Sequence, residues 1–208
     1  MPDKKNSAII GYSGHSLVVL EAAELMNLNV AYYCEKKQSS DNPFHLGYLG
    51  DEGSSSFDWN AVDHFILGIG DNKIRQKIAK LLQSKKKQIL NILHPASIIS
   101  NYASIGIGNF VAVNATINAF AKTANYCILN TGCIIEHECI IENGVHIAPG
   151  AVLAGNVSVG ENSFVGANSV VKQGVVIGKE VIIGAGSVVI KDIPDHEVWA
   201  GNPAKKIK

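Results

Sequence analysis

An aliphatic side chain returns at every sixth position over the last half of the chain. Fifteen of the sixteen positions counted from Ile99 to Val189 are aliphatic, and Thr123 is the exception. The residue two places before each position is mostly small, as at Ala115 and Cys133. Helices and ordinary strands repeat every 3.6 and 2 residues, so neither produces this spacing. The period predicts a hexapeptide parallel β-helix, in which three hexads make one triangular coil of about 18 residues.

The first half of the chain follows a different pattern, in which short apolar runs alternate with segments of helical spacing. It predicts strands over 6–13, 30–35, 63–70 and 87–93, helices over 14–29 and 71–82, and a polar loop over 39–60. Alternation of this kind is typical of a small, Rossmann-like parallel sheet with helices on its faces. We therefore expect two domains, an α/β domain over 1–95 and an all-β parallel β-helix with a C-terminal tail over 96–208.

Charge and composition exclude several classes of protein. Lys plus Arg (18) equals Asp plus Glu (18), which argues against nucleic acid or an anionic membrane as the partner. No apolar run reaches the roughly 18 residues that a membrane helix needs, and the N-terminus makes a poor secretory signal. The four cysteines lack CxxC spacing, so we expect a cytoplasmic protein. Three of them, Cys127, Cys133 and Cys139, occupy the small slot of successive hexads; they suit small buried hydrophobes, with a catalytic thiol as the weaker alternative.

The triplet Glu-His-Glu at 136–138 is the most polar interruption of the middle hexads. Histidine titrates near neutrality, so His137 can take up and release a proton there. Residues 18 apart stack one strand spacing apart, roughly 4.8 Å, which places His137 directly below Gly155. A glycine backbone can be approached closely. The triplet is therefore either the base of a catalytic site or a solvated surface histidine on a turn.

A second column joins Ala167 to Ala185, also 18 residues apart, on the neighbouring face that carries His146. A shared zinc site is a weak alternative for the histidines. Zinc needs at least three protein ligands, and His137 and His146 are nine residues apart with no third histidine nearby at a suitable spacing. We expect no metal.

A glycine-rich turn, Gly11 to His15, ends the first predicted strand and opens the first helix. Free backbone N–H groups and the helix dipole favour phosphate at such a place. Glu35 ends the second strand, where an acidic residue can bind a ribose hydroxyl, and Gly70 ends the third on the same edge of the sheet. The pattern favours a nucleotide or nucleotide-sugar site over a set of tight turns.

Five motifs in this order resemble the bacterial sugar O- and N-acetyltransferases, and most closely the UDP-4-amino-sugar N-acetyltransferases of the bacillosamine pathway. They are GxSGH, GIGDNxIR, LNTGCIIEHEC, VHIAPGAVLAGNVSVG and VWAGNPAKKI. The resemblance covers essentially the whole chain. It implies a left-handed β-helix, a homotrimer with acetyl-CoA between adjacent prisms, and a nucleotide-sugar in the N-terminal domain.

The resemblance also implies roles for individual residues. His137 would be the general base and Glu138 would raise its basicity, while the stacked Gly155 is our candidate for the oxyanion donor. The residues that would contact acetyl-CoA are His146, Ala167 and Ala185. Those that would bind the sugar nucleotide are Ser13, Gly14 and His15, with Glu35 and Gly70 nearby.

The expected function is acetyl transfer from acetyl-CoA to the 4-amino group of a UDP-linked deoxy-sugar, for surface glycan biosynthesis. The bacillosamine enzymes carry two aspartates after the second strand, where this chain has Glu35 and Lys36. This departure leaves open the nucleotide base and the sugar. The alternatives are a GDP- or dTDP-linked amino sugar, O-acetylation of a sialic acid, and, in another class, a non-catalytic nucleotide-sugar-binding scaffold.

Overall fold

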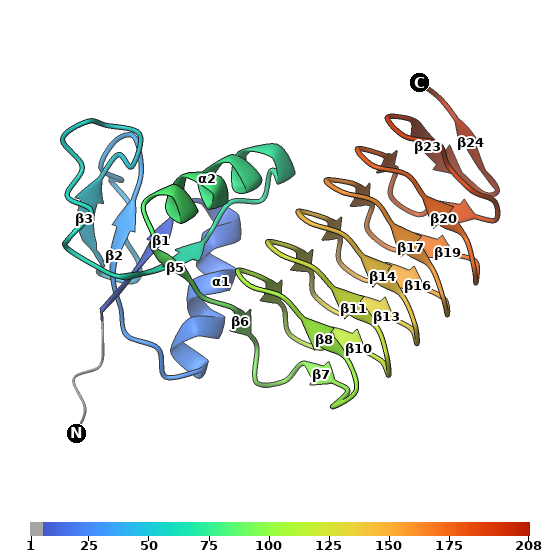
Figure 1. Cartoon of the computed structure of the whole chain (residues 1–208), viewed down its shortest axis with the longest axis horizontal. Coiled ribbons are helices and arrows are strands. Elements are labelled where there is room, and N and C mark those ends of the chain that lie inside the picture. Colours follow the sequence, from blue (N-terminus) through green and yellow to red (C-terminus); the bar gives the residue numbers. More distant parts are fainter. Residues whose placement is uncertain (1–5) are drawn as a thin grey trace.

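The computed structural model describes residues 6–208, which form an α/β unit and a long solenoid beside it (Figure 1). Residues 1–5 lie outside the described residues. The expectation that the N-terminus makes a poor secretory signal rests partly on them. The α/β unit has a parallel sheet in the order β3-β2-β1-β4-β5. Its strands are β1 (Ser7–Ile10), β2 (Val30–Cys34), β3 (Gly47–Gly50), β4 (His64–Leu67) and β5 (Gln88–Ile89), and its helices are α1 (Gly14–Leu25) and α2 (Asn72–Ser84).

The two helices cover opposite faces of this sheet. Successive residues of β1 point to opposite faces, so Ala8 packs in the cluster that contains α2, and Ile9 packs in the cluster that contains α1. Helix α2 begins at an N-cap, Asp71, whose carboxylate accepts a hydrogen bond from the Ile74 N–H at 2.8 Å. Helix α1 ends earlier than expected because Asn27 adopts a left-handed conformation, with φ 57°.

Two sequence predictions for this unit were wrong. The expected polar loop over 39–60 contains strand β3, which pairs with β2 at the sheet edge although its sequence is rich in glycine. The segment 87–93, expected to form one strand, is divided between two sheets: β5 pairs with β4, whereas β6 (Ile92–Leu93) pairs with β9 of the solenoid. Asn91 marks the crossing, since its side chain binds the Gly106 carbonyl and the Asn109 N–H.

The solenoid is a three-sided prism of two-residue strands, and the chain visits its faces in the order first, second, third (Figure 1). The first face contains β7 (Ile98–Ile99), β10 (Thr116–Ile117), β13 (Ile134–Ile135), β16 (Val152–Leu153), β19 (Val170–Val171) and β22 (Val188–Val189). The second contains β8 (Ser104–Ile105), β11 (Lys122–Thr123), β14 (Ile140–Ile141), β17 (Ser158–Val159) and β20 (Val176–Ile177). The third contains β6, β9 (Phe110–Val111), β12 (Ile128–Leu129), β15 (His146–Ile147), β18 (Phe164–Val165), β21 (Ile182–Ile183), β23 (Val198–Gly201) and β24 (Ala204–Lys206).

The six-residue period is confirmed by the strand register. Each strand from β6 to β22 pairs in parallel with a strand 18 residues away, as Ile117 does with Ile135, and the second residue of these strands points into the prism. At the C-terminal end, β23 pairs with β21 at a 16-residue separation, and β24 pairs antiparallel with β23. The inward Thr123 is only 4% exposed, and among residues 6–208 its hydroxyl has no hydrogen-bond partner. By contrast, the small-slot hydroxyl of Ser163 donates to the Gly178 carbonyl and accepts from the Val181 N–H.

The α/β unit is fastened to the edge between the second and third faces by Arg75 of α2. This side chain is 1% exposed and donates to carbonyls of both units, at 2.7 Å to Tyr126, 2.8 Å to Gly144 and 2.9 Å to Gly70. Buried cations are stable only when their donors are satisfied. Arg75 therefore holds the segment after β4 and the first turn of α2 in a fixed position against the prism.

Candidate active site

His137 lies on the turn between the first and second faces, with its imidazole half exposed. Its Nδ1 atom is 3.1 Å from Oε2 of Glu138, so the carboxylate orients the ring, and Nε2 makes no hydrogen bond within residues 6–208. Gly155 is stacked against the same ring. A Cβ atom added to Gly155 would lie 2.5 Å from Nε2, so any larger residue here would push the imidazole out of its present position.

Glu138 occupies a turn position that does not favour its residue type. Its φ is 61°, in the left-handed region that costs free energy for residues other than glycine and asparagine. The equivalent residue one coil above is Asn156 and the one two coils above is Gly174. A carboxylate kept at this position beside His137 indicates a specific use for it.

A pocket of about 340 Å³ opens at the carboxyl ends of β1, β2 and β4, in the α/β unit. Gly11, Ser13, Glu35 and Gly70, which the sequence pointed to, all line it. Oε1 of Glu35 accepts a hydrogen bond from the Tyr12 N–H at 2.9 Å, which fixes this carboxylate beside the glycine turn. Space around Gly14 is open, since within residues 6–208 no atom beyond its own turn of helix lies within 4 Å of where a Cβ would stand. The arrangement has room for a phosphate at the start of α1 and a ribose beside Glu35.

Glu52, which is not among the residues predicted from the sequence, also lines this pocket. Burial raises the pKa of its carboxyl group, and the nearby carboxylates of Asp51 and Glu35 add to the effect. It follows β3, the strand that was expected to be loop, so no periodic signal pointed to it.

His15 and His146 meet where the α/β unit touches the third face, with ring centroids 6.4 Å apart. The Nδ2 atom of Asn130 lies 3.1 Å from Nε2 of His146. Burial, together with the positive charge of Arg75, lowers the pKa of His146 to about 3 and that of His15 to about 4. Both rings are therefore neutral at pH 7, and they are suited to hydrogen bonding rather than to proton transfer. Among residues 6–208, Nε2 of His15 is buried without a partner.

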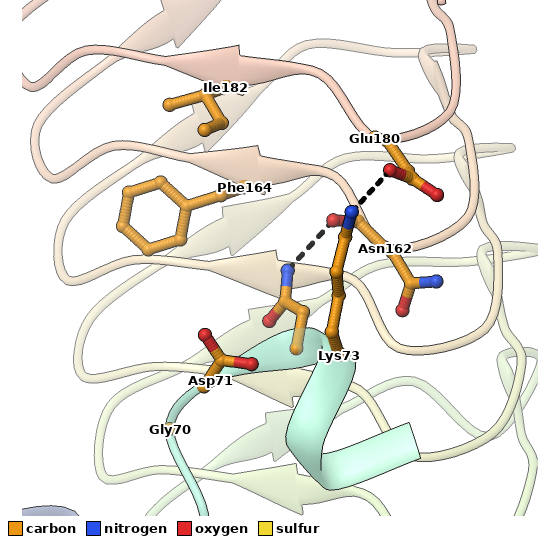
Figure 2. Close-up of a pocket in the computed structure, with 8 residues that line it drawn as sticks. Gly70, Asp71, Lys73, Asn162, Phe164, Glu180 and Ile182 are labelled. Carbon is orange, nitrogen blue, oxygen red and sulfur yellow. Dashed lines mark hydrogen bonds and ion pairs between the residues drawn. The ribbon is translucent and has the colours of Figure 1, made fainter. Parts of the chain in front are cut away.

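A second pocket, of about 380 Å³, lies between the start of α2 and the third face (Figure 2). Phe164 and Ile182 project into it from successive strands, and Lys73 forms a 2.6 Å ion pair with Glu180 at its rim. This pocket shares Gly70 and Asp71 with the first one, so the two pockets lie on either side of the segment that follows β4.

Phe164 and Ile182 follow His146 at the 18-residue spacing, so the period could have predicted both as lining residues. Ala167 and Ala185 lie on the turns after the strands of these two residues, where Ala185 is exposed and Ala167 is half buried. The predicted site residues thus fall in two places. Those of the α/β unit meet His146 and the third face, whereas His137, Glu138 and Gly155 lie on a different edge of the prism.

The alternatives involving thiols and metals find little support in the geometry. Burial raises the pKa of Cys127 and of Cys133 to about 12, so neither is a thiolate at neutral pH. Across residues 6–208, no three His, Cys, Asp or Glu side chains are grouped so that they could hold a metal ion. The same residues include no helix that is both long and apolar enough to cross a membrane.

Comparisons with known proteins agree with this architecture. The profile of the PglD N-terminal domain matches residues 6–82, and that of the hexapeptide repeat of succinyl-transferase matches residues 156–191. The acetyltransferase domain of PglB from Neisseria gonorrhoeae is similar over 98% of this chain and 100% of that chain, with 29% identity and a TM-score of 0.90. Its complex with acetyl coenzyme A has a TM-score of 0.91.

A perosamine N-acetyltransferase from Caulobacter crescentus, solved with CoA and GDP-perosamine, is 31% identical. The match covers 98% of this chain and 97% of that chain, with a TM-score of 0.90. The chain belongs to the family of sugar N-acetyltransferases of the left-handed β-helix class. It is an acyltransferase that uses acetyl-CoA, and the expected combination of α/β domain and left-handed β-helix is confirmed.

Proposed function

We propose that this protein transfers the acetyl group of acetyl-CoA to the 4-amino group of a UDP-linked amino-deoxy-sugar, a step in surface glycan biosynthesis. The observation that carries the proposal is the arrangement of His137. Its Nδ1 faces the Glu138 carboxylate, and its Nε2 lies against the backbone of Gly155. This arrangement supports the proposal, because a base and a backbone donor that adjoin each other could act on one thioester carbonyl.

In this mechanism the sugar amine attacks the thioester carbonyl, forming the C–N bond, and Nε2 of His137 removes the proton that the nitrogen loses. The N–H of Gly155 donates no hydrogen bond within residues 6–208, so it is available to the developing oxyanion. The C–S bond then breaks, and the departing CoA thiolate takes the proton from the imidazolium. Glu138 stabilises the imidazolium between these two steps.

The pocket of the α/β unit would hold the nucleotide. Its diphosphate would meet the turn of Ser13 and Gly14, with the ribose beside Glu35 and with His15 nearby. The sugar would then pass Gly70 into the second pocket, towards Phe164. Ala167 and Ala185 suit the pantetheine arm of acetyl-CoA because their small side chains leave the adjoining edge open. In the part of the chain that the structure describes, only the chain neighbours of the adjacent Gly186 lie within 4 Å of where its Cβ would stand.

A homotrimer would complete the site. Among residues 6–208, no hydrogen bond or ion pair links His137 to the α/β unit of its own chain. A second copy would bring the edge that carries His137 to the sugar pocket of the first, and three copies around an axis would form three equivalent sites. Exposed apolar residues on the first and second faces, Ile98, Ile140, Val170 and Val176, support contact between copies.

A GDP-linked amino sugar is the second candidate acceptor. The specific observation in its favour is the 31% identity to an enzyme solved with GDP-perosamine. Lys36 beside Glu35, where the bacillosamine enzymes have a second aspartate, also distinguishes this pocket. The reaction and the base would be the same for either nucleotide.

Mass spectrometry of reaction products tests the proposal. Acetyl-CoA is supplied with UDP-, GDP- and dTDP-linked 4-amino sugars and with a sialic acid, for the wild type and for His137→Ala. His196→Ala is the matched control, because it removes another exposed histidine that lies beside a glutamate. We expect one acetyl group on the UDP-linked amino sugar and loss of most of the rate in His137→Ala alone. Acetylation of the sialic acid only, or an unimpaired His137→Ala, would contradict the proposal.

A further inference from the structure

Below Glu138 on the same edge of the prism, two aromatic rings are exposed. Phe120 lies one coil below Glu138, and Tyr102 one coil lower still, at the same 18-residue spacing. Their ring centroids are 5.5 Å apart, and the two residues are 59% and 72% exposed. Large exposed rings of this kind have no role in the core of the prism, which the inward aliphatic residues fill.

The backbone of Phe120 adds a second, independent observation. Its φ is 63°, in the left-handed region that a bulky side chain adopts at a cost in free energy. Ten of the fourteen equivalent turn positions from Gly108 to Gly186 carry glycine or asparagine, which tolerate this conformation. Phe120 is therefore one of four exceptions.

The other three exceptions each have a partner that accounts for them. Tyr126 is buried against the α/β unit, Glu180 pairs with Lys73, and Glu138 pairs with His137. Within residues 6–208, the only aromatic ring that the ring of Phe120 contacts is that of Tyr102, at a tilt of 35°, and Phe120 remains more than half exposed. Burial within the chain does not offset its backbone strain, which indicates a partner outside the chain.

The pair is continuous with the proposed base. The Glu138 N–H donates to the carbonyl of Ala119 at 3.1 Å, so the turn of Phe120 lies directly under that of His137. Gly155 lies on the opposite side of His137, one coil above. The proposed oxyanion donor is thus on one side of the imidazole, and the exposed rings are on the other.

We propose that Phe120 and Tyr102 of one copy form the wall against which the ring of an amino sugar held by the α/β unit of a neighbouring copy lies, with its amine directed at Nε2 of His137 beside that wall. This inference rests on the proposed function. Pyranose rings carry an apolar C–H face, and a deoxy-sugar has fewer hydroxyl groups to interrupt it. Aromatic side chains provide a large apolar surface with little entropy to lose, and the Tyr102 hydroxyl can remain in contact with water.

Steady-state kinetics of Phe120→Ala, Phe120→Leu and Phe120→Trp test the inference, with the amino sugar that the wild type acetylates best. We expect Phe120→Ala to raise the KM for the sugar about five- to tenfold, as for the loss of one aromatic contact, with the KM for acetyl-CoA unchanged. Phe120→Trp should restore most of the affinity, whereas Phe120→Leu should not. The matched control is Ile190→Ala, another exposed apolar residue on this edge, which should behave as wild type.

Each other outcome overturns the inference in a recognisable way. An increase in the KM for acetyl-CoA would assign the wall to the cofactor. A smaller assembly of Phe120→Ala in light scattering would make the pair a contact between copies. Unchanged constants would leave the rings without a role in the reaction. If the proposed function itself is wrong, the wild-type protein will acetylate no amino sugar, and this result is distinct from all of the outcomes above.

Discussion

The imidazole of His137 covers the backbone of Gly155, so closely that a single added methyl group would lie 2.5 Å from Nε2. The contact follows from the register of the solenoid, in which residues 18 apart stack. It joins a group that can accept a proton to an N–H that can donate to an oxyanion, without any movement of the fold.

Gly155→Ala should therefore reduce acetylation sharply while the protein remains folded. The new methyl group would displace the imidazole, and we expect kcat to fall about 100-fold, as for the loss of a positioned base. The backbone of Gly155 is not left-handed, so the thermal melting temperature should change little. Gly174→Ala, on the next coil of the same edge, is the control. Its φ of 74° predicts a loss of stability of about 1 kcal/mol with activity retained. Equal activity of Gly155→Ala and wild type would show that the imidazole does not act from this position.

Glu138→Gln should lower kcat while leaving the KM for acetyl-CoA unchanged. The glutamine can still accept a hydrogen bond from Nδ1, but it does not stabilise the imidazolium that forms during the reaction. We expect a decrease of at least tenfold, on the scale of general-base effects. Initial rates at saturating acetyl-CoA measure it. A Glu138→Gln variant as fast as wild type would show that the Glu138 carboxylate has no role in the reaction.

Acid should destabilise the protein below about pH 6.5 through His15 and His146. Both pKa values are lowered in the folded state, to about 4 and about 3, so the unfolded chain binds protons that the folded chain does not. The stabilisation is complete above the unfolded pKa of about 6.5 and is lost as the pH falls towards the folded values, at up to about 1.4 kcal/mol per pH unit for each histidine.

Urea unfolding at pH 7, 6 and 5 checks this prediction. The free energy of unfolding should fall more steeply with acid in the wild type than in the double variant His15→Gln, His146→Gln. Parallel curves for the two proteins would mean that these rings do not remain neutral in the folded state.

Thr123→Val should stabilise the solenoid. The threonine hydroxyl is buried at an inward position without a hydrogen-bond partner among residues 6–208, and valine has nearly the same shape. Removing an unsatisfied buried hydroxyl is worth about 1 kcal/mol. Ser163→Ala is the opposite control, because its buried hydroxyl makes two hydrogen bonds and its loss should destabilise by a similar amount. A lower melting temperature for Thr123→Val would contradict the argument.

The six-residue period by itself determined the prism, the inward positions and the stacking of His137 on Gly155. These features repeat along the chain, and each depends on neighbours at one constant separation of 18 residues. A periodic pattern is visible in a sequence because the same local requirement is satisfied again at every coil. Thr123, the one inward residue that is not aliphatic, was visible for the same reason.

The tertiary structure alone decided where the two units meet. The segment 87–93 was expected to form one strand, but its second part, β6, pairs with β9 of the prism. Strand β3 lies at the edge of the sheet although its sequence is rich in glycine. Arg75 donates hydrogen bonds to carbonyls of residues far apart in the sequence. These bonds hold the α/β unit against the prism, where Gly70 and Phe164 line the second pocket together. Such contacts occur once and depend on the packing of distant segments, so neither propensity nor periodicity predicts them.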